Sequence, residues 1–162
     1  MKKKIFNLKS LMLVGIILVV WVIIILNNAA NEDEVMEYDA DMIIEYALFR
    51  ESIGDLSPHF SQMMEQPDLK FDENWNKGLK ESLNTIKRSA DGLVVDDYPR
   101  SRKEQQETAK NVRDYAHKFV DNYLESIETR DIHLEDKAVE YLHFVQDEVE
   151  ILDEQMRKDW EK

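Results

Sequence analysis

Two pairs of residues have the spacing of metal ligands on a helix: Asp114 with His117, and Glu140 with His143. Two such pairs can hold two metal ions inside a helical bundle, provided that all four side chains point inward. Counting about 100° per residue, they fall about 100° to 160° from the centre of the apolar stripe of their helix. We therefore predict exposed polar residues and no metal site. A metal-dependent enzyme remains the second alternative function.

The segment 72–83 begins like a calcium-binding loop, with oxygen-bearing side chains at alternate positions from Asp72. Such a loop needs a glycine at its sixth position and a glutamate at its twelfth. The chain has Lys77 and Leu83 at these two positions. We therefore predict that Asp72 caps a helix by accepting a backbone N–H bond, and that no calcium binds.

Motifs for nucleophilic catalysis are missing from the sequence. It contains no cysteine, no Gly-x-Ser-x-Gly turn and no glycine-rich phosphate loop. Because 34 residues are acidic, some carboxylates must lie near one another, so their abundance does not indicate a glycosidase pair. We predict no catalytic residue, no cofactor and no enzymatic activity.

The N-terminal region has the pattern of a membrane anchor. The stretch Leu11 to Leu26 is apolar throughout, and residues 10–31 carry no charge. At about 1.5 Å per residue a helix over 10–31 measures about 33 Å, enough for a hydrocarbon core of about 30 Å. The lysines before it predict a cytoplasmic basic N-terminus over 1–9 and an extracytoplasmic domain over 32–162 in the cell membrane.

A cleaved signal peptide is the alternative for this segment. The apolar stretch is longer than the 7–15 residues, roughly, of a signal peptide. Cleavage after Ala30 would also place Asn28 where a small residue is required. These features favour an anchor that stays attached, and hence a single-pass membrane protein.

The predicted extracytoplasmic part is strongly acidic. Four of the 21 basic residues and none of the 34 acidic ones precede it, which leaves a net charge of −17. Such a surface repels nucleic-acid phosphates and anionic lipid headgroups and favours a cationic partner. The alternative is that the carboxylates only keep the domain soluble.

The scarcity of turn residues predicts a few long helices, since there are only four glycines and three prolines. The first helix is expected to start near Asp33, with a kink or a fresh start at Pro58 capped by Ser57. The next is expected to run from Asp72 to Gly92. Apolar residues of these two segments recur at helical spacing, at Val35, Met42, Tyr46, Phe49, Ile53, Leu56, Phe60, Met63, Trp75, Leu79, Leu83, Ile86 and Ala90.

Two further helices are predicted in the C-terminal half. One starts at Ser101, which forms a reciprocal capping pattern with Glu104, and the other spans 134–160. The short connection 130–133 makes them antiparallel. We therefore predict an all-α chain, with one transmembrane helix followed by an antiparallel up-down bundle of about four helices. A coiled-coil oligomer is the alternative. The apolar positions are Ala109, Val112, Ala116, Phe119, Val120, Tyr123, Ile127, Ala138, Tyr141, Leu142, Val145, Val149, Leu152 and Met156.

Two surfaces are candidates for binding. The candidate interaction surface combines the polar start of the third predicted helix with acidic residues of the fourth: Arg100, Arg102, Lys103, Glu104, Asp147, Glu148, Glu150, Asp153 and Glu154. The candidate membrane contact is the C-terminal group that an antiparallel bundle brings back toward the bilayer: Arg157, Lys158, Trp160 and Lys162. The alternative is that Trp160 only completes an apolar stripe.

The sequence therefore predicts a non-enzymatic protein that acts by binding. An anchored, acidic helical domain without a catalytic motif suits a module that binds another envelope protein or a cationic peptide, and no nucleic acid. A ligand-sensing bundle that works through a partner protein is the first alternative.

Overall fold

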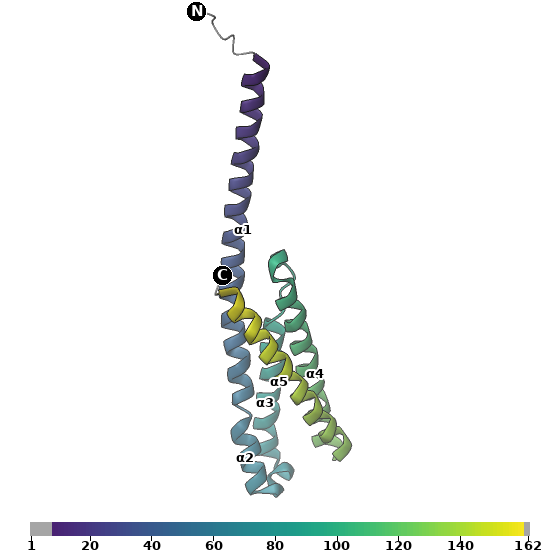
Figure 1. The fold of residues 1–162 in the computed structure, drawn as a ribbon. Helices are drawn as coiled ribbons and strands as arrows, with labels where there is room; N and C mark the ends of the chain where they lie inside the picture. Colours follow the sequence, from purple (N-terminus) through teal and green to yellow (C-terminus); the bar gives the residue numbers. More distant parts are fainter. Residues whose placement is uncertain (1–7, 161–162) are drawn as a thin grey trace, which may run out of the picture.

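The computed structural model describes residues 8–160, with side chains described at residue 22 and at residues 31–159. Every element in this part is helical, as predicted, and no strand occurs in it (Figure 1). The elements are α1 (Leu8–Gly54), α2 (Ser57–Glu65), η1 (Pro67–Phe71), α3 (Glu73–Gly92), η2 (Arg100–Arg102), α4 (Lys103–Thr129) and α5 (Ile132–Trp160).

The first helix is longer than predicted. α1 is continuous over 47 residues, about 70 Å at 1.5 Å per residue, and its N-terminal part extends beyond the other helices (Figure 1). The expected separate start near Asp33 is wrong, because neither proline nor glycine interrupts residues 16–53.

Within the described part of the chain, no helix has both the length and the apolar character needed to cross a membrane. The expected N-terminus, 1–9, and the expected anchor, 10–31, fall on residues whose side chains lie outside the description, apart from residues 22 and 31.

α1 gives way to α2 at a kink, as the proline predicted. Pro58 occupies the first turn of α2, where its missing N–H costs no hydrogen bond. The prediction that Ser57 caps this helix is wrong: Leu56 is the N-cap and already has helical dihedral angles, with φ −76° and ψ −26°. The serine is therefore the first helical residue and makes no capping bond.

α3 begins and ends where the sequence indicates. The Asp72 carboxylate accepts a hydrogen bond from the backbone N–H of Trp75 at 2.8 Å, which confirms the predicted cap. The helix ends at Gly92, where the side chain of Glu45 from α1 lies directly over the glycine. A residue with a β-carbon at this position would displace the carboxylate of Glu45.

α4 starts differently from the prediction. Ser101 lies in the short η2 helix, and Arg102 is the N-cap of α4 without any side-chain capping bond. The expected reciprocal cap between Ser101 and Glu104 is therefore wrong. A 3-10 turn precedes α4 in place of that cap. In this turn the N–H of Arg102 donates a hydrogen bond to the carbonyl of Pro99 at 2.8 Å.

The turn between α4 and α5 is as short as predicted. Arg130 ends α4 in the left-handed conformation, with φ 60°, and its N–H bonds to the carbonyl of Ser126 at 2.8 Å. Asp131 then accepts the backbone N–H of His133 at 2.9 Å. This turn makes α4 and α5 antiparallel, as Figure 1 shows.

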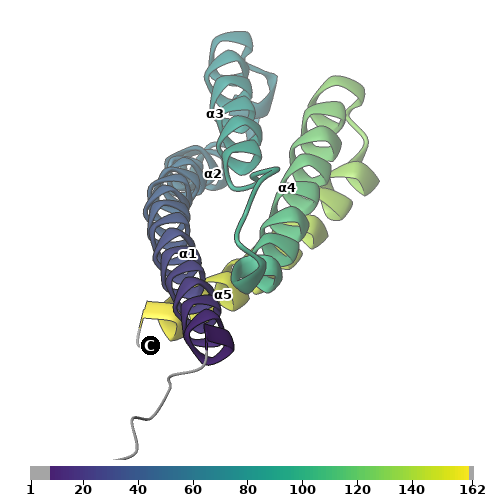
Figure 2. The same ribbon diagram turned by 90° about the horizontal axis from the view of Figure 1, so that it is seen from above.

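The helices form a bundle in which α5 crosses from α4 toward α1 (Figure 2). Its core follows the predicted periodicity. Nearly all the predicted apolar positions from Met42 onward are buried or packed against the core. The fully enclosed side chains come from every long helix: Phe49, Leu79, Leu83, Ile86, Val112, Phe119, Val120, Val145 and Leu152.

Candidate functional site

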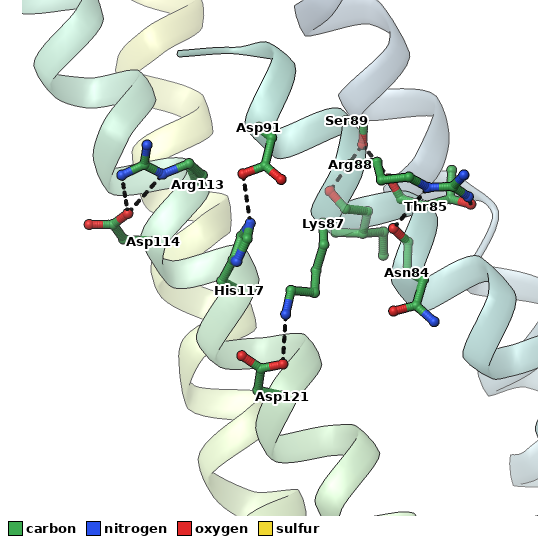
Figure 3. Close-up of polar contacts among 11 residues, drawn as sticks. Asn84, Thr85, Lys87, Arg88, Ser89, Asp91, Arg113, Asp114, His117 and Asp121 are labelled. Carbon is green, nitrogen blue, oxygen red and sulfur yellow. Dashed lines mark hydrogen bonds and ion pairs between the residues drawn. The ribbon is translucent and has the colours of Figure 1, made fainter.

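The residues with metal-ligand spacing take part in ordinary surface contacts. Asp114 accepts hydrogen bonds from its neighbour Arg113, the shorter at 2.7 Å (Figure 3). His117 Nε2 lies 2.9 Å from Asp91 Oδ1 and so joins α4 to α3. Glu140 and His143 are exposed on α5. Across the described residues no group of three histidine, aspartate or glutamate side chains could hold a metal ion.

A second ion pair joins α3 to α4 beside His117. Lys87 Nζ lies 2.8 Å from Asp121 Oδ1, and Figure 3 shows both contacts along the same seam between the helices. Half-exposed pairs of this kind contribute little energy, about 0–1 kcal/mol each. Both contacts join α3 to α4.

The most buried polar cluster lies where α4 begins. Arg102 binds both carboxylate oxygens of Asp39 at 2.7 Å, and Asp159 lies 3.5 Å from the same guanidinium. Gln105 adds a hydrogen bond to Asp159 at 2.8 Å. We call Asp39, Arg102, Gln105 and Asp159 the polar clamp, because these residues tie the start of α4 to α1 and to the end of α5.

The ion pair of the polar clamp is largely buried, and this burial affects the pKa of Arg102. The side chain of Arg102 is only 10% exposed and that of Asp39 only 18%. The hydrogen bonds that Arg102 donates to Asp39 raise the pKa of Arg102, while burial acts in the opposite direction. Arg102 is therefore enclosed within the domain, unlike Arg100, Lys103 and Glu104 of the candidate interaction surface, which are exposed.

Beside the clamp, Gln106 is fully buried. It donates to the Tyr38 hydroxyl at 2.9 Å and to the carbonyl of Leu93 at 3.1 Å, and accepts the N–H of Val95. Burial raises the pKa of Tyr38 to about 12, so this hydroxyl stays protonated. The polar start of α4 is thus buried at three of its residues, Arg102, Gln105 and Gln106.

Three other residues of the candidate interaction surface line one pocket together with Lys158 of α5: Arg100, Lys103 and Glu104. Arg100, Lys103 and Glu104 are exposed at the start of α4, and Asp147 and Glu150 are exposed on α5. The remaining acidic residues have partners within the domain. Asp153 accepts the Tyr46 hydroxyl at 3.1 Å, Glu148 accepts Asn111 at 3.3 Å, and Glu154 pairs with Lys158 at 2.8 Å.

The C-terminal group returns to the same end of the bundle as residues 31–39. Asp159 and Asn31 line one groove, so the last turn of α5 lies beside α1 there. Arg157 and Lys158 are exposed on this turn. The side chain of Trp160 and all of Lys162 lie outside the described residues.

Sequence reasoning missed a second apolar face on α1. Its members are exposed, with Met36 at 67%, Ile44 at 57% and Leu48 at 48%, and they point away from the core stripe. We call this the outward face of α1: Met36, Ala40, Ile43, Ile44, Ala47 and Leu48. The steps of four, three and four from Met36 to Ala47 were the signal that could have revealed it.

A groove of about 590 Å³ begins on this face. It is an open groove lined by Val35, Met36, Ala40 and Ile43 of α1 and by Asp159 of α5. Exposed carboxylates accompany the apolar side chains along the helix. Asp33, Glu37, Asp41 and Glu51 have no ion-pair partner among the described residues. The outward face therefore combines exposed apolar side chains with exposed carboxylates on the same helix.

No known protein family, no curated protein and no solved structure matches this chain. The features of this chain that bear on function are therefore the outward face of α1 and the exposed carboxylates on the same helix.

Proposed function

We propose that this chain is a single-pass membrane protein whose extracytoplasmic helical domain binds a basic amphipathic helix of another envelope protein or peptide. The observation that carries the proposal is the outward face of α1, which exposes Met36, Ile44 and Leu48 on one helix. Contiguous apolar side chains on a soluble surface are typical of a binding site. An amphipathic helix that lays its apolar side in such a groove is a common mode of recognition.

Charge indicates what kind of helix fits. Asp33, Glu37, Asp41 and Glu51 border the outward face without basic partners among the described residues. A helix with lysine or arginine beside its apolar stripe would neutralise them and associate faster. A second copy of this chain would instead bring carboxylates against carboxylates, and residues 32–162 already carry a net charge of −17. This repulsion favours a cationic partner over self-association.

The membrane attachment is part of the same proposal. Residues 10–31 are uncharged, follow a cluster of lysines and suit the thickness of a bilayer. The anchor would hold the domain at the outer surface, with the last turn of α5 facing the lipid. The chain should then stay in the membrane after alkaline extraction, and protease added from outside should digest residues 32–162. Release into the soluble fraction would contradict the attachment.

The binding itself is tested by titration of the full chain in lipid nanodiscs. The probe is a synthetic helix with leucine on one side and lysine on the other, and the control is the same peptide with glutamate in place of lysine. We expect saturable binding of the basic peptide alone, after subtraction of binding to empty nanodiscs. Leu48→Lys should weaken it about tenfold, because a half-buried leucine contact of about 1.4 kcal/mol is replaced by like charge.

Val139→Lys is the matched control, since it adds the same single charge at an apolar position of α5 that is 47% exposed, against 48% for Leu48. It should leave the affinity for the basic peptide within about twofold of the unchanged chain. Equal affinity for both peptides, or equal weakening by both substitutions, would contradict the proposed site.

A further inference from the structure

A second concave site lies at the other end of the bundle from the groove at Met36. It is a pocket of about 330 Å³ between η1 and the turn that joins α4 to α5. This volume is within the range of small-molecule sites in proteins, about 300–1,000 Å³. Phe71, Ile127 and Met63 supply much of its apolar lining. The pocket is therefore large enough for a small ligand with an apolar body.

Two cations border the same pocket. Lys70 Nζ lies 5.4 Å from the centre of the Phe71 ring, and the Arg130 guanidinium lies 5.1 Å from it. Neither has an ion-pair partner among the described residues, although Glu135 also lines the pocket. In residues 32–162, acidic residues outnumber basic ones two to one. Two neighbouring cations beside one pocket are therefore unusual in this domain.

A third hydrogen-bond donor faces the same space. Tyr123 lines the pocket, and its hydroxyl donates a hydrogen bond to the thioether sulfur of Met63 at 3.7 Å. A thioether is a weak acceptor, so this buried hydroxyl could donate a stronger bond to an oxygen of a ligand. Burial raises the pKa of Tyr123 to about 12, which keeps the donor proton in place at neutral pH.

We propose that this pocket binds a small amphipathic anion, such as a carboxylate with an aliphatic or aromatic body. The apolar body would contact Phe71 and Ile127, and the carboxylate would accept bonds from Lys70, Arg130 and Tyr123. Charge-assisted bonds of this kind are stronger than neutral ones, and the ammonium and guanidinium both donate to carboxylates. The pocket does not involve the outward face of α1, so the two proposals stand or fall separately.

The test uses ligand-observed NMR on the full chain in lipid nanodiscs, with phenylbutyrate and octanoate as probes. Phenylbutanol and phenylbutylamine are the uncharged and positively charged controls. We expect saturable binding of at least one carboxylate, and binding on the order of tenfold weaker for both controls. The absence of saturable binding by both carboxylates, relative to empty nanodiscs, would overturn the proposal.

Variants locate the binding. Lys70→Gln and Arg130→Asn should each weaken carboxylate binding several-fold, and asparagine is chosen because it tolerates the left-handed conformation at position 130. Tyr123→Phe should weaken it without changing the apolar lining. Lys110→Gln is the matched control, because Lys110 lies 5.5 Å from the Tyr98 ring in a similar contact elsewhere. Equal binding by all four variants would overturn the assignment.

Discussion

Asp39→Ala is expected to destabilise the bundle by about 3 kcal/mol, because it leaves the buried guanidinium of Arg102 without its main partner. Removing one member of a buried ion pair costs about 3–5 kcal/mol. In the variant, Asp159 would still lie 3.5 Å from the Arg102 guanidinium. The Asp39 side chain is also 18% exposed, so the ion pair is not completely buried. Both features place the expected loss at the lower end of that range.

The loss should be visible as a lower melting temperature. For a domain of this size, 1 kcal/mol corresponds to about 3–4 °C, so the midpoint should fall by about 10 °C. The assay is thermal unfolding of the full chain in lipid nanodiscs, followed by circular dichroism. Asp41→Ala is the matched control, since Asp41 is exposed two residues away on α1 and should shift the midpoint by about 2 °C at most.

A double variant separates the ion pair from other effects. Asp39→Ala combined with Arg102→Met removes both charges, so it should be less destabilised than Asp39→Ala alone. The reasoning is refuted if Asp39→Ala melts like the Asp41→Ala control. It is refuted equally if the double variant melts at the sum of the two single shifts.

Three other outcomes follow from the structure. Asp72→Ala should lower the free energy of unfolding by about 1 kcal/mol in denaturant titrations, because the Trp75 N–H loses its acceptor; Asp68→Ala, one turn earlier, should change it little. Burial and a neighbouring carboxylate raise the pKa of Tyr46 to about 12. The stability from this shift is fully present below pH 10 and should be lost between about pH 10 and 12 in alkaline unfolding scans. Asp41→Asn should reduce the salt dependence of basic-peptide binding in the nanodisc titration.

These three predictions have clear contrary outcomes. Equal unfolding free energies for Asp72→Ala and Asp68→Ala would exclude a capping contribution. Tyr46→Phe should reduce the alkaline loss of stability in part, since the pKa values of Tyr38 and Tyr123 are raised to about 12 as well; an unchanged loss would exclude a contribution from Tyr46. An unchanged salt dependence in Asp41→Asn would remove this carboxylate from the docking surface.

The core could be predicted from the sequence because each helix has one apolar stripe at the helical period. Leu79, Leu83, Ile86 and Ala90 follow such spacing, and all four are buried. Local signals also placed the cap at Asp72 and the short turn at 130–133. These features depend on residues close together in the chain.

The polar clamp could not be predicted in the same way. Arg102 and Asp39 are 63 positions apart, and the sequence around Arg102 has the polar composition of a solvated helix start. Burial of this arginine depends on where α1 and α5 come to lie. The pocket at Phe71 and Arg130 also depends on distant segments, so local spacing carries no signal for it.

The outward face of α1 was missed for a different reason. The sequence predicts one apolar stripe on this helix, which includes Val35, Met42 and Phe49. The second set of apolar residues, including Met36 and Ile44, lies on the opposite side and remained unassigned. A helix with two apolar sides needs neighbours on both, and within the described part of the chain the side with Met36, Ile44 and Leu48 is left exposed.

Site-specific photo-crosslinking in intact cells tests the central proposal most directly. A photoreactive residue at position 44, on the outward face, should form an adduct with one defined partner that carries a basic amphipathic helix. The adduct should disappear when Leu48→Lys is added, and the same photoreactive residue at position 140 should not form it. An adduct that survives Leu48→Lys, or equal adducts from positions 44 and 140, would contradict binding through this face.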